Sequence, residues 1–348
     1  MSVAIASLGW VTPLGGGLDE VWVQLREGVI PETKTLSHPL SGRALPHFVV
    51  PPATLAQLQR NPRLRRSSTI SYLGVAAGLA AIENSGLALT PELAERTAVV
   101  FAIADGGVAY TRRFYEQIVK EGANAASPLL FPETVYNAPA SHLAAQLGIN
   151  GASYTLVGDA SVGLAALHFG GELLATEDVD QVVVVGAEEI DWILCDAYRE
   201  WRLARTPLAE GAAALVLRRE GRWQLQTHPG APFFRRCDAA AALRTVLADL
   251  ATHGPVEVIV NGHNGTFVDQ ATDLALAHWF PKFGGAVFSP KRSLGEAPGA
   301  GALQQVVVAA MALEKLKLSN ALVPVIGWNQ QAGGARITAP AGLPQAGG

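Results

Sequence analysis

The stretch Thr155-Leu-Val-Gly-Asp-Ala-Ser-Val-Gly-Leu-Ala-Ala-Leu167 decides how this chain is expected to fold. Residues 153–157 follow the pattern of a β-strand, Gly158 and Asp159 interrupt it, and residues 160–176 are rich in helix-forming side chains without proline. The pattern predicts a strand, a tight turn and a helix. A residue at such a turn lies beside unpaired backbone N–H groups and the positive end of the helix dipole, which stabilise a thiolate or an oxyanion. The turn is therefore a favourable position for a nucleophile.

Strands and helices alternate in the same order in both halves of the chain. The run Asp180-Gln-Val-Val-Val-Val-Gly-Ala-Glu-Glu189 is suited to a buried parallel strand and completes one βαβ unit. In the second half the pattern predicts strands at 256–260 and 285–289, and helices at 269–280 and 301–316. We therefore expect an α/β protein built from two similar halves.

Composition narrows the class of protein. The chain has 348 residues, 49% of them hydrophobic, and a formal net charge of −4, which suits a large buried core. Its lysines and arginines are scattered, so we expect no nucleic-acid partner. We find neither a signal-peptide pattern nor an uninterrupted apolar run of membrane-spanning length, and we expect a soluble cytoplasmic protein. The two cysteines, Cys195 and Cys237, form neither a disulfide framework nor a zinc site, and we expect no metal and no cofactor.

Six stretches, in matching order along the chain, resemble the β-ketoacyl synthases of the thiolase-like superfamily. Residues 160–188 are similar to the family's active-site region, where Cys-Ala-(Ser/Thr)-(Gly/Ser) precedes a helix and a strand ending in Gly-Gly-Ala-Glu. The other similar stretches are residues 3–15, 65–87, 96–107, 131–148 and 209–217.

The resemblance implies a thiolase-like fold of five layers, α-β-α-β-α, with two pseudo-duplicated βαβ halves. We expect an N-terminal ketosynthase-like half at residues 1–220 and a C-terminal half at 221–348. The family ends in Asn-Ser-Phe-Gly-Phe-Gly-Gly, whose Phe gates the acyl pocket and whose backbone N–H completes the oxyanion hole. After Val323-Pro-Val-Ile-Gly-Trp-Asn329 this motif is missing. We therefore expect the second half to be truncated, without gate or oxyanion donor and with two strands lost, so that either the fold is trimmed there or another segment covers the exposed sheet edge.

The resemblance also places the family's catalytic groups on this sequence. Without gaps, the nucleophilic cysteine falls on Ala160, the lysine on Lys291 and the second histidine on Glu296. An ionised glutamate offers no proton to a thioester oxygen and repels an enolate. A neutral Glu296 would donate one hydrogen bond, but we expect an ion pair with Lys291 or another structural role.

The position of the family's first histidine is ambiguous. Its motif resembles Asn261-Gly-His-Asn-Gly-Thr266. Counting forward from the preceding strand places His263 at the catalytic position, whereas counting back from Gly265 and Thr266 places Asn264 there. We prefer His263, and the alternative is a loop histidine bonded to the backbone.

Ser161 is the obvious substitute nucleophile, one residue after Ala160. A serine also needs an adjacent base. We expect Ser161 to cap the helix or to fill a small space, and Asp159 to be an N-cap rather than a general base.

The resemblance implies a protein of fatty-acid or polyketide-type biosynthesis that has lost condensation, because removing a catalytic nucleophile commonly costs about 10⁴–10⁶ in turnover. It is similar to chain-length factors, which lack the cysteine and pair with an active ketosynthase. The expected partners are that ketosynthase in a heterodimer, or a second copy in a homodimer, and an acyl carrier protein or acyl thioester. Arg63, Arg65 and Arg66 are a candidate patch for an acidic carrier protein, or else a solvated face or salt-bridge donors.

Two other functions are compatible with the sequence. One is an active acyltransferase, thioesterase or malonyl decarboxylase that uses His263 with Ser161, Asp159 or Glu296. The other is a catalytically silent acyl-binding module.

Overall fold

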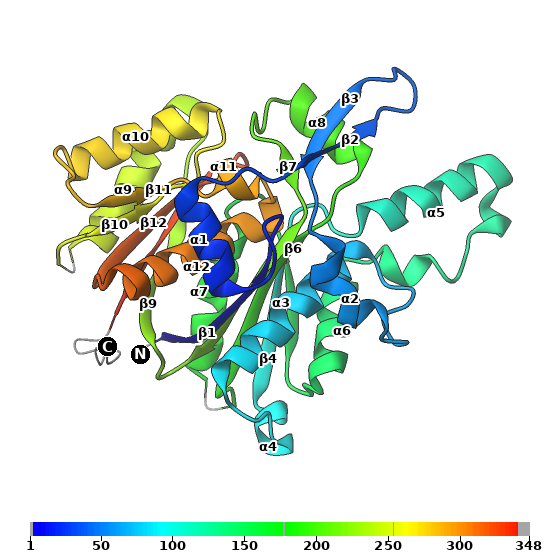
Figure 1. Ribbon diagram of the computed structural model, residues 1–348, viewed down its shortest axis with the longest axis horizontal. Coiled ribbons are helices and arrows are strands. Elements are labelled where there is room, and N and C mark those ends of the chain that lie inside the picture. The colour runs from blue at the N-terminus through cyan, green and yellow to red at the C-terminus, as the bar shows by residue number, and fades with distance from the viewer. Residues whose placement is uncertain (1–2, 177, 253, 340–348) are drawn as a thin grey trace.

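The computed structural model describes residues 3–176, 178–252 and 254–339 (Figure 1). The main strands of the first half are β1 (Ala4–Val11), β4 (Thr97–Ile103), β5 (Ser153–Val157), β6 (Gln181–Glu188) and β8 (Gly211–Arg218). Those of the second half are β9 (Trp223–Pro232), β10 (Val258–Val260), β11 (Ala286–Phe288), β12 (Asn320–Ile326) and β13 (Gln331–Thr338).

The two halves have the same strand order. It is β5-β4-β6-β8-β1 in the first half and β11-β10-β12-β13-β9 in the second. In each half the first three strands of this order are parallel and the last two pair antiparallel. A short antiparallel pairing of β1 with β9 joins the halves into one sheet of ten strands. The predicted duplication is therefore present in the pairing itself, while the boundary at residue 220 stays a prediction.

Helices form three layers around the two halves of the sheet (Figure 1). Between the halves lie α7 (Val162–Leu174) and α12 (Pro298–Leu316), which pack against each other and against strands of both halves. The outer faces are covered by α3 (Thr69–Ser85) and α6 (Ala138–Leu147) in the first half, and by α9 (Ala239–Ala251) and α10 (Phe267–Trp279) in the second. This is the expected five-layered, thiolase-like α-β-α-β-α fold.

The β-branched run of β6 shows why the sequence forms these layers. Side chains alternate across a strand. Accordingly, Val182 and Val184 enter the central core, whereas Val183 and Val185 enter the outer core of the first half. A strand buried on both faces needs a continuous apolar run, as the sequence analysis assumed.

The expected loss of two strands near the C-terminus is wrong. Strands β12 and β13 pair antiparallel along their whole length, and β13 also pairs with β9. In the part of the chain that the structure describes, the second half therefore has as many main strands as the first. A short turn, residues 327–330, connects β12 to β13 at the point where the sequence lacks the family's glycine motif.

Two additions stand outside the layers. Helix α5 (Val108–Glu121) and the residues that follow it project as an arm (Figure 1). A small sheet of β2 (Thr33–Ser37), β3 (Ala44–Phe48) and β7 (Leu208–Ala209) lies with α8 (Trp192–Glu200) at the top of the view. The shorter helices are α1 (Leu18–Glu27), α2 (Ala56–Gln59), α4 (Pro91–Glu95) and α11 (Lys291–Leu294). Over the described residues, no helix has the length and apolar character needed to cross a bilayer.

Candidate functional site

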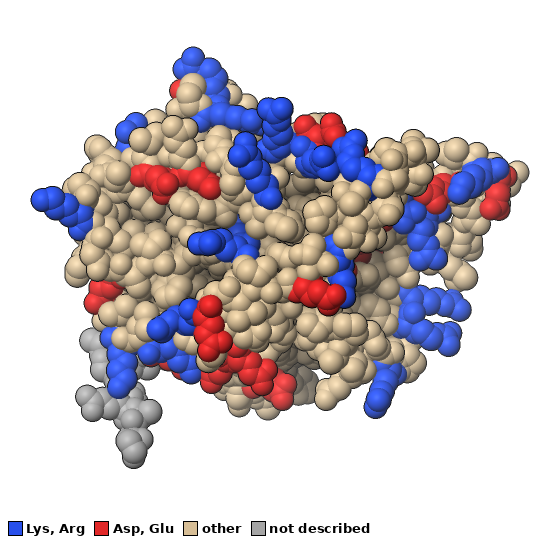
Figure 2. All heavy atoms as spheres, turned by 45° about the horizontal axis from the view of Figure 1, so that its top comes forward, with Lys and Arg blue, Asp and Glu red and all other residues tan. Residues whose placement is uncertain are grey.

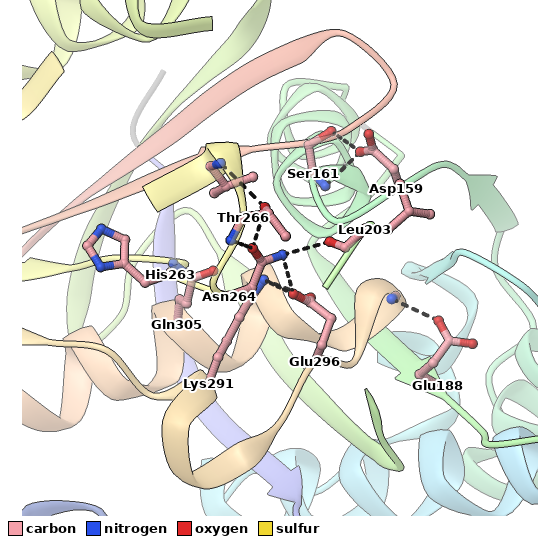
Figure 3. A network of polar contacts seen from close by, with 12 residues as sticks. Asp159, Ser161, Glu188, Leu203, His263, Asn264, Thr266, Lys291, Glu296 and Gln305 are labelled. Carbon is pink, nitrogen blue, oxygen red and sulfur yellow. Dashed lines mark hydrogen bonds and ion pairs between the residues drawn. The ribbon is translucent and has the colours of Figure 1, made fainter. Parts of the chain in front are cut away.

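The turn between β5 and α7 holds Asp159, Ala160 and Ser161, where the sequence predicts it. Ala160 is 3% exposed, and Ser161 occupies the N-cap position of α7. The Asp159 carboxylate accepts hydrogen bonds from the Ser161 backbone N–H at 2.9 Å and from its hydroxyl at 2.8 Å (Figure 3). Ser161 is bonded to Asp159 and, within the described ranges, to no histidine. The Asp159 carboxylate is therefore the basic group within hydrogen-bond reach of the Ser161 hydroxyl, and any nucleophilic role of Ser161 stays a prediction.

A buried polar cluster lies across the site, on the second half of the chain (Figure 3). The Lys291 ammonium, on α11, lies 2.7 and 2.9 Å from the two carboxylate oxygens of Glu296. Glu296 stands between α11 and α12 and is fully buried, and Lys291 is 6% exposed. Two opposite charges in this geometry neutralise each other. The structure thus shows a buried ion pair, and the role of either residue toward a substrate stays a prediction.

Asn264 completes this cluster, and His263 does not join it. The Asn264 side-chain amide donates to Glu296 at 2.9 Å and to the Leu203 carbonyl at 3.0 Å, and its oxygen accepts from the Thr266 hydroxyl at 2.6 Å. In Figure 3 the His263 ring points away, and its Nε2 atom lies 3.1 Å from an oxygen of Asp273 on α10.

The structure places Asn264 in the cluster and turns His263 toward Asp273, while the catalytic role expected of His263 stays a prediction. The loop explains the difference. The Asp269 carboxylate accepts hydrogen bonds from the backbone N–H groups of Asn264 and Gly265, and Gly265 has a φ of +83°, which favours glycine. These contacts direct the residue immediately before Gly265 into the cluster. Counting back from Gly265 and Thr266 is the register that the loop follows.

The turn between β12 and β13 closes over Asp159 from the second half. The Asn329 backbone N–H donates to the other Asp159 oxygen at 2.5 Å. A Cβ atom on Gly327 would lie 2.3 Å from both carboxylate oxygens, so only glycine allows this approach. Next to it, Trp328 packs edge-on against Tyr198, with ring centroids 5.2 Å apart. An aromatic side chain and a backbone donor are thus present in this turn, although the sequence lacks the family's glycine motif.

Two adjacent carboxylates at the end of β6 accept hydrogen bonds from the first turns of three helices, a role that was not predicted from the sequence. Glu188 accepts from the Gly299 N–H in the first turn of α12 at 3.0 Å. Glu189 accepts from the Ile70 N–H in α3 at 3.0 Å and from the Ala109 N–H in α5 at 2.9 Å. Burial, and the neighbouring Asp105 carboxylate, raise the pKa of Glu188 well above its usual value, and burial raises the pKa of Glu189. Two acidic residues directly after a buried run were the available signal.

Two pockets open beside the site. One, of about 420 Å³, is lined by residues of β5, by Asp159 and Ser161, and by Asn329. The other, of about 570 Å³, has apolar walls that include Leu45 and Tyr198, and carries three arginines: Arg199, Arg202 and Arg205. The backbone N–H of Arg205 donates to the Asn264 carbonyl at 2.8 Å, so the loop after α8, which carries Arg202 and Arg205, also positions the cluster.

Of the two cysteines, Cys195 is buried and burial raises the pKa of its thiol to about 12, so it is not a nucleophile. Cys237 is exposed and lies 3.6 Å from an Asp238 oxygen. Across the residues that the structure describes, no three His, Cys, Asp or Glu side chains are grouped so that they could hold a metal ion.

Comparison with known proteins identifies the family. Residues 1–221 match the family model described as "Beta-ketoacyl synthase, N-terminal domain". The chain belongs to the β-ketoacyl synthase family. Among curated relatives, it is 24% identical over 194 residues to 3-oxoacyl-[acyl-carrier-protein] synthase 2 of Vibrio cholerae, covering 54% of this chain and 45% of that protein. It thus spans about half the length of this curated relative.

Solved structures of ketosynthases match almost the whole chain. A β-ketoacyl synthase from Burkholderia phymatum has a TM-score of 0.82 at 15% identity, covering 98% of this chain and 100% of that one. The ishigamide ketosynthase/chain length factor has a TM-score of 0.77 at 19% identity, covering 98% and 100%. At these identities the likeness supports the ketosynthase fold alone. The roles of Ala160, Ser161, His263, Lys291 and Glu296 stay predictions.

Proposed function

We propose that this ketosynthase-family protein is a condensation-inactive partner of an active ketosynthase in fatty-acid or polyketide biosynthesis, similar in role to a chain-length factor. The observation that carries the proposal is the buried cluster of Lys291, Glu296 and Asn264, whose polar groups bond one another. Condensation needs a nucleophile and hydrogen-bond donors aimed at the developing negative charge. Here the turn carries Ala160, and the donors that could serve a substrate are occupied by Glu296.

The exposed edge strand β5, at one end of the ten-stranded sheet, supports pairing with a second ketosynthase-type chain. Strand β5 is the last strand of its sheet and pairs only with β4 among the described strands. Its side chains Tyr154 and Val157 are 41% and 52% exposed. An unpaired apolar edge strand is a site of association or aggregation unless another chain covers it. The likeness to a ketosynthase/chain length factor structure makes a ketosynthase the partner we favour.

The projecting arm offers a second apolar surface for the same partner. A pocket of about 490 Å³ opens between α5 and the start of α8, with Tyr115, Val119 and Ile193 in its lining. Val119 is 83% exposed. Apolar patches that extend over a surface commonly mark protein interfaces.

An acyl carrier protein, or an acyl thioester, is the proposed second ligand. Arg63, Arg65 and Arg66 are exposed, and none of them forms an ion pair with another described residue. They are therefore free to meet an acidic carrier, and the salt-bridge alternative finds no support. Figure 2 shows basic side chains spread over one face with acidic side chains between them, rather than in one continuous stripe. This pattern suits a local protein contact better than a nucleic acid.

The alternative enzyme on this fold is not supported by the geometry. It required His263 to act with Ser161, Asp159 or Glu296, but His263 faces Asp273 while Ser161 is bonded to Asp159. Acyl- and malonyl-thioesters incubated with the purified chain should show no hydrolysis or decarboxylation above background. Turnover that disappears in Ser161→Ala or His263→Ala would revive this alternative.

The partner proposal is tested by co-expression with a cysteine-containing ketosynthase encoded in the same genome. We expect one stable complex on size-exclusion chromatography. Val157→Lys should abolish it because a charge on the edge strand opposes burial, whereas Leu274→Lys, an equally exposed apolar position on α10, should leave it intact. A chain that remains an unpaired monomer with its ketosynthase, or equal effects of both variants, would overturn the proposal.

A further inference from the structure

The Asp159 carboxylate joins the two halves of the molecule at the centre of the site. It accepts hydrogen bonds from the Ser161 N–H, the Ser161 hydroxyl and the Asn329 N–H. The first two donors belong to Ser161 at the start of α7, and the third, Asn329, lies 170 residues after Asp159 along the chain. Both carboxylate oxygens are therefore bonded, and the donors come from opposite halves.

These three donors are what stabilises the carboxylate. Asp159 is 3% exposed, and among the described side chains no lysine, arginine or histidine forms an ion pair with it. A buried carboxylate without a cation requires several hydrogen bonds. The Ser161 donors bind one carboxylate oxygen and the Asn329 N–H binds the other, so the donors from the two segments are spaced to bind both oxygens of a carboxylate. In this molecule the chain itself supplies the anion.

The surroundings leave room for a different occupant. Gly327 has no side chain where a Cβ atom would meet the carboxylate at 2.3 Å. On the other side, the pocket of about 420 Å³ is lined by Asp159, Ser161 and Asn329. The carboxylate and the residues that donate to it thus border the same open space. Without the carboxylate, those residues would border that space with their donors unpaired.

We propose that Asp159 is an internal plug: its carboxylate fills a position that, once vacated, binds the carboxylate of a small acid through the same donors. The inference goes beyond the proposed function, because it concerns what these donors bind once the Asp159 carboxylate is removed. It requires no ketosynthase partner. The plug is a positioning feature of the turn, not a reacting group.

Chemical complementation of Asp159→Ala tests the plug. The variant removes the carboxylate and leaves the three donors unpaired, so its thermal unfolding midpoint should fall below that of the wild type. Sodium acetate or formate should raise the midpoint saturably, whereas sodium chloride at the same ionic strength should not. The wild type and Ser161→Ala, which both keep the Asp159 carboxylate and its bond to Asn329, should show no saturable response. An Asp159→Ala variant that responds to acetate no more than the wild type does would overturn the proposal.

A variant too unstable to purify is still informative. Asp159→Ala is then expressed and purified in parallel with acetate and with chloride, and the soluble folded yield is compared. A severalfold higher yield with acetate supports the plug, and equal yields, including none in either salt, count against it. Because these measurements use the isolated chain, their failure leaves the partner proposal standing, and failed complex formation leaves the plug standing.

Discussion

At the scale of single residues, the buried polar side chains of the site form hydrogen bonds and an ion pair with one another. Lys291 and Glu296 satisfy each other, and Asn264 donates to the same carboxylate. Such a pair is weak evidence for added stability, since removing two charges from water costs about as much as their attraction returns. Its clear consequence is that neither residue can be lost alone.

Breaking this pair should therefore be costly. Lys291→Met leaves the Glu296 carboxylate buried without its cation, and we expect a loss of about 3–5 kcal/mol in the free energy of unfolding. In Lys291→Met/Glu296→Gln no charge remains, and most of the loss should be recovered. Urea unfolding of the wild type and both variants measures this. A single variant as stable as the wild type would mean that water or another group solvates Glu296.

Glu210 should make stability depend on pH. Burial raises the pKa of this carboxyl to about 7, against a usual value of 4.5, although it accepts a hydrogen bond from the Val50 N–H. Because the folded state holds the proton more tightly, the stabilising contribution is complete below 4.5 and is lost as the pH rises through 7. The loss is about 3 kcal/mol at most. Glu210→Gln stays neutral, so its stability relative to the wild type should rise between about pH 5 and about pH 8; an unchanged difference in urea unfolding would contradict this.

The sequence predicted some of these residues and not others for physical reasons. Lys291 and Glu296 are five residues apart in a motif without an insertion, so their register was clear. Whether His263 or Asn264 enters the cluster depends on hydrogen bonds that backbone N–H groups of the loop donate to Asp269, which lies beyond the motif. The contact of Asp159 with Asn329 joins residues 170 positions apart, and no local pattern predicts such a contact.

At the scale of elements, strands and helices with regular apolar spacing were predicted correctly from the sequence, and a strand without that spacing was missed. The strand at 153–157 and the helix after it were predicted almost as they occur, because apolar side chains recur at strand and helix spacing. Strand β13 was missed. Its sequence Gln331-Ala-Gly-Gly-Ala-Arg-Ile-Thr338 contains two adjacent glycines, which are poor strand formers. It is a strand because β12 and β9 flank it on both sides.

The close packing of helix α12 on strand β6 depends on Gly186 in β6. A Cβ atom there would lie 2.3 Å from the Gly299 carbonyl oxygen in the first turn of α12. Gly186→Ala should therefore push α12 away and destabilise the fold by about 1–3 kcal/mol. Gly284→Ala is the matched control, because nothing lies within 4 Å of its Cβ position. Thermal unfolding compares them, and equal midpoints for the two variants would contradict this account of the packing.

At the scale of the whole molecule, a duplicated fold brings turns from both halves to one place. Asp159 to Ser161 come from the first half, and Asn264, Lys291, Glu296 and Asn329 from the second. The same convergence that would assemble a catalytic site here assembles hydrogen bonds and an ion pair. Fold and chemistry are therefore separable in this chain, since the layers depend on apolar periodicity and the chemistry on a few turn residues.

The separation predicts that restoring the nucleophile alone will not restore condensation. In Ala160→Cys, a thiol stands at the start of α7, but Asn264 and Glu296 cannot donate protons as two histidines would, and Asp159 occupies the nearby N–H groups. Each missing donor is worth about 10²–10³ in rate. We expect Ala160→Cys to accept an acyl group slowly from an acyl thioester, and condensation with a malonyl thioester to stay near background. Ala160→Cys/Asn264→His/Glu296→His, which also frees Lys291, should exceed the single variant by at least about 10²-fold. Product analysis by mass spectrometry separates acylation from condensation. If Ala160→Cys alone condenses as fast as the triple variant, the buried cluster is not what silences this site.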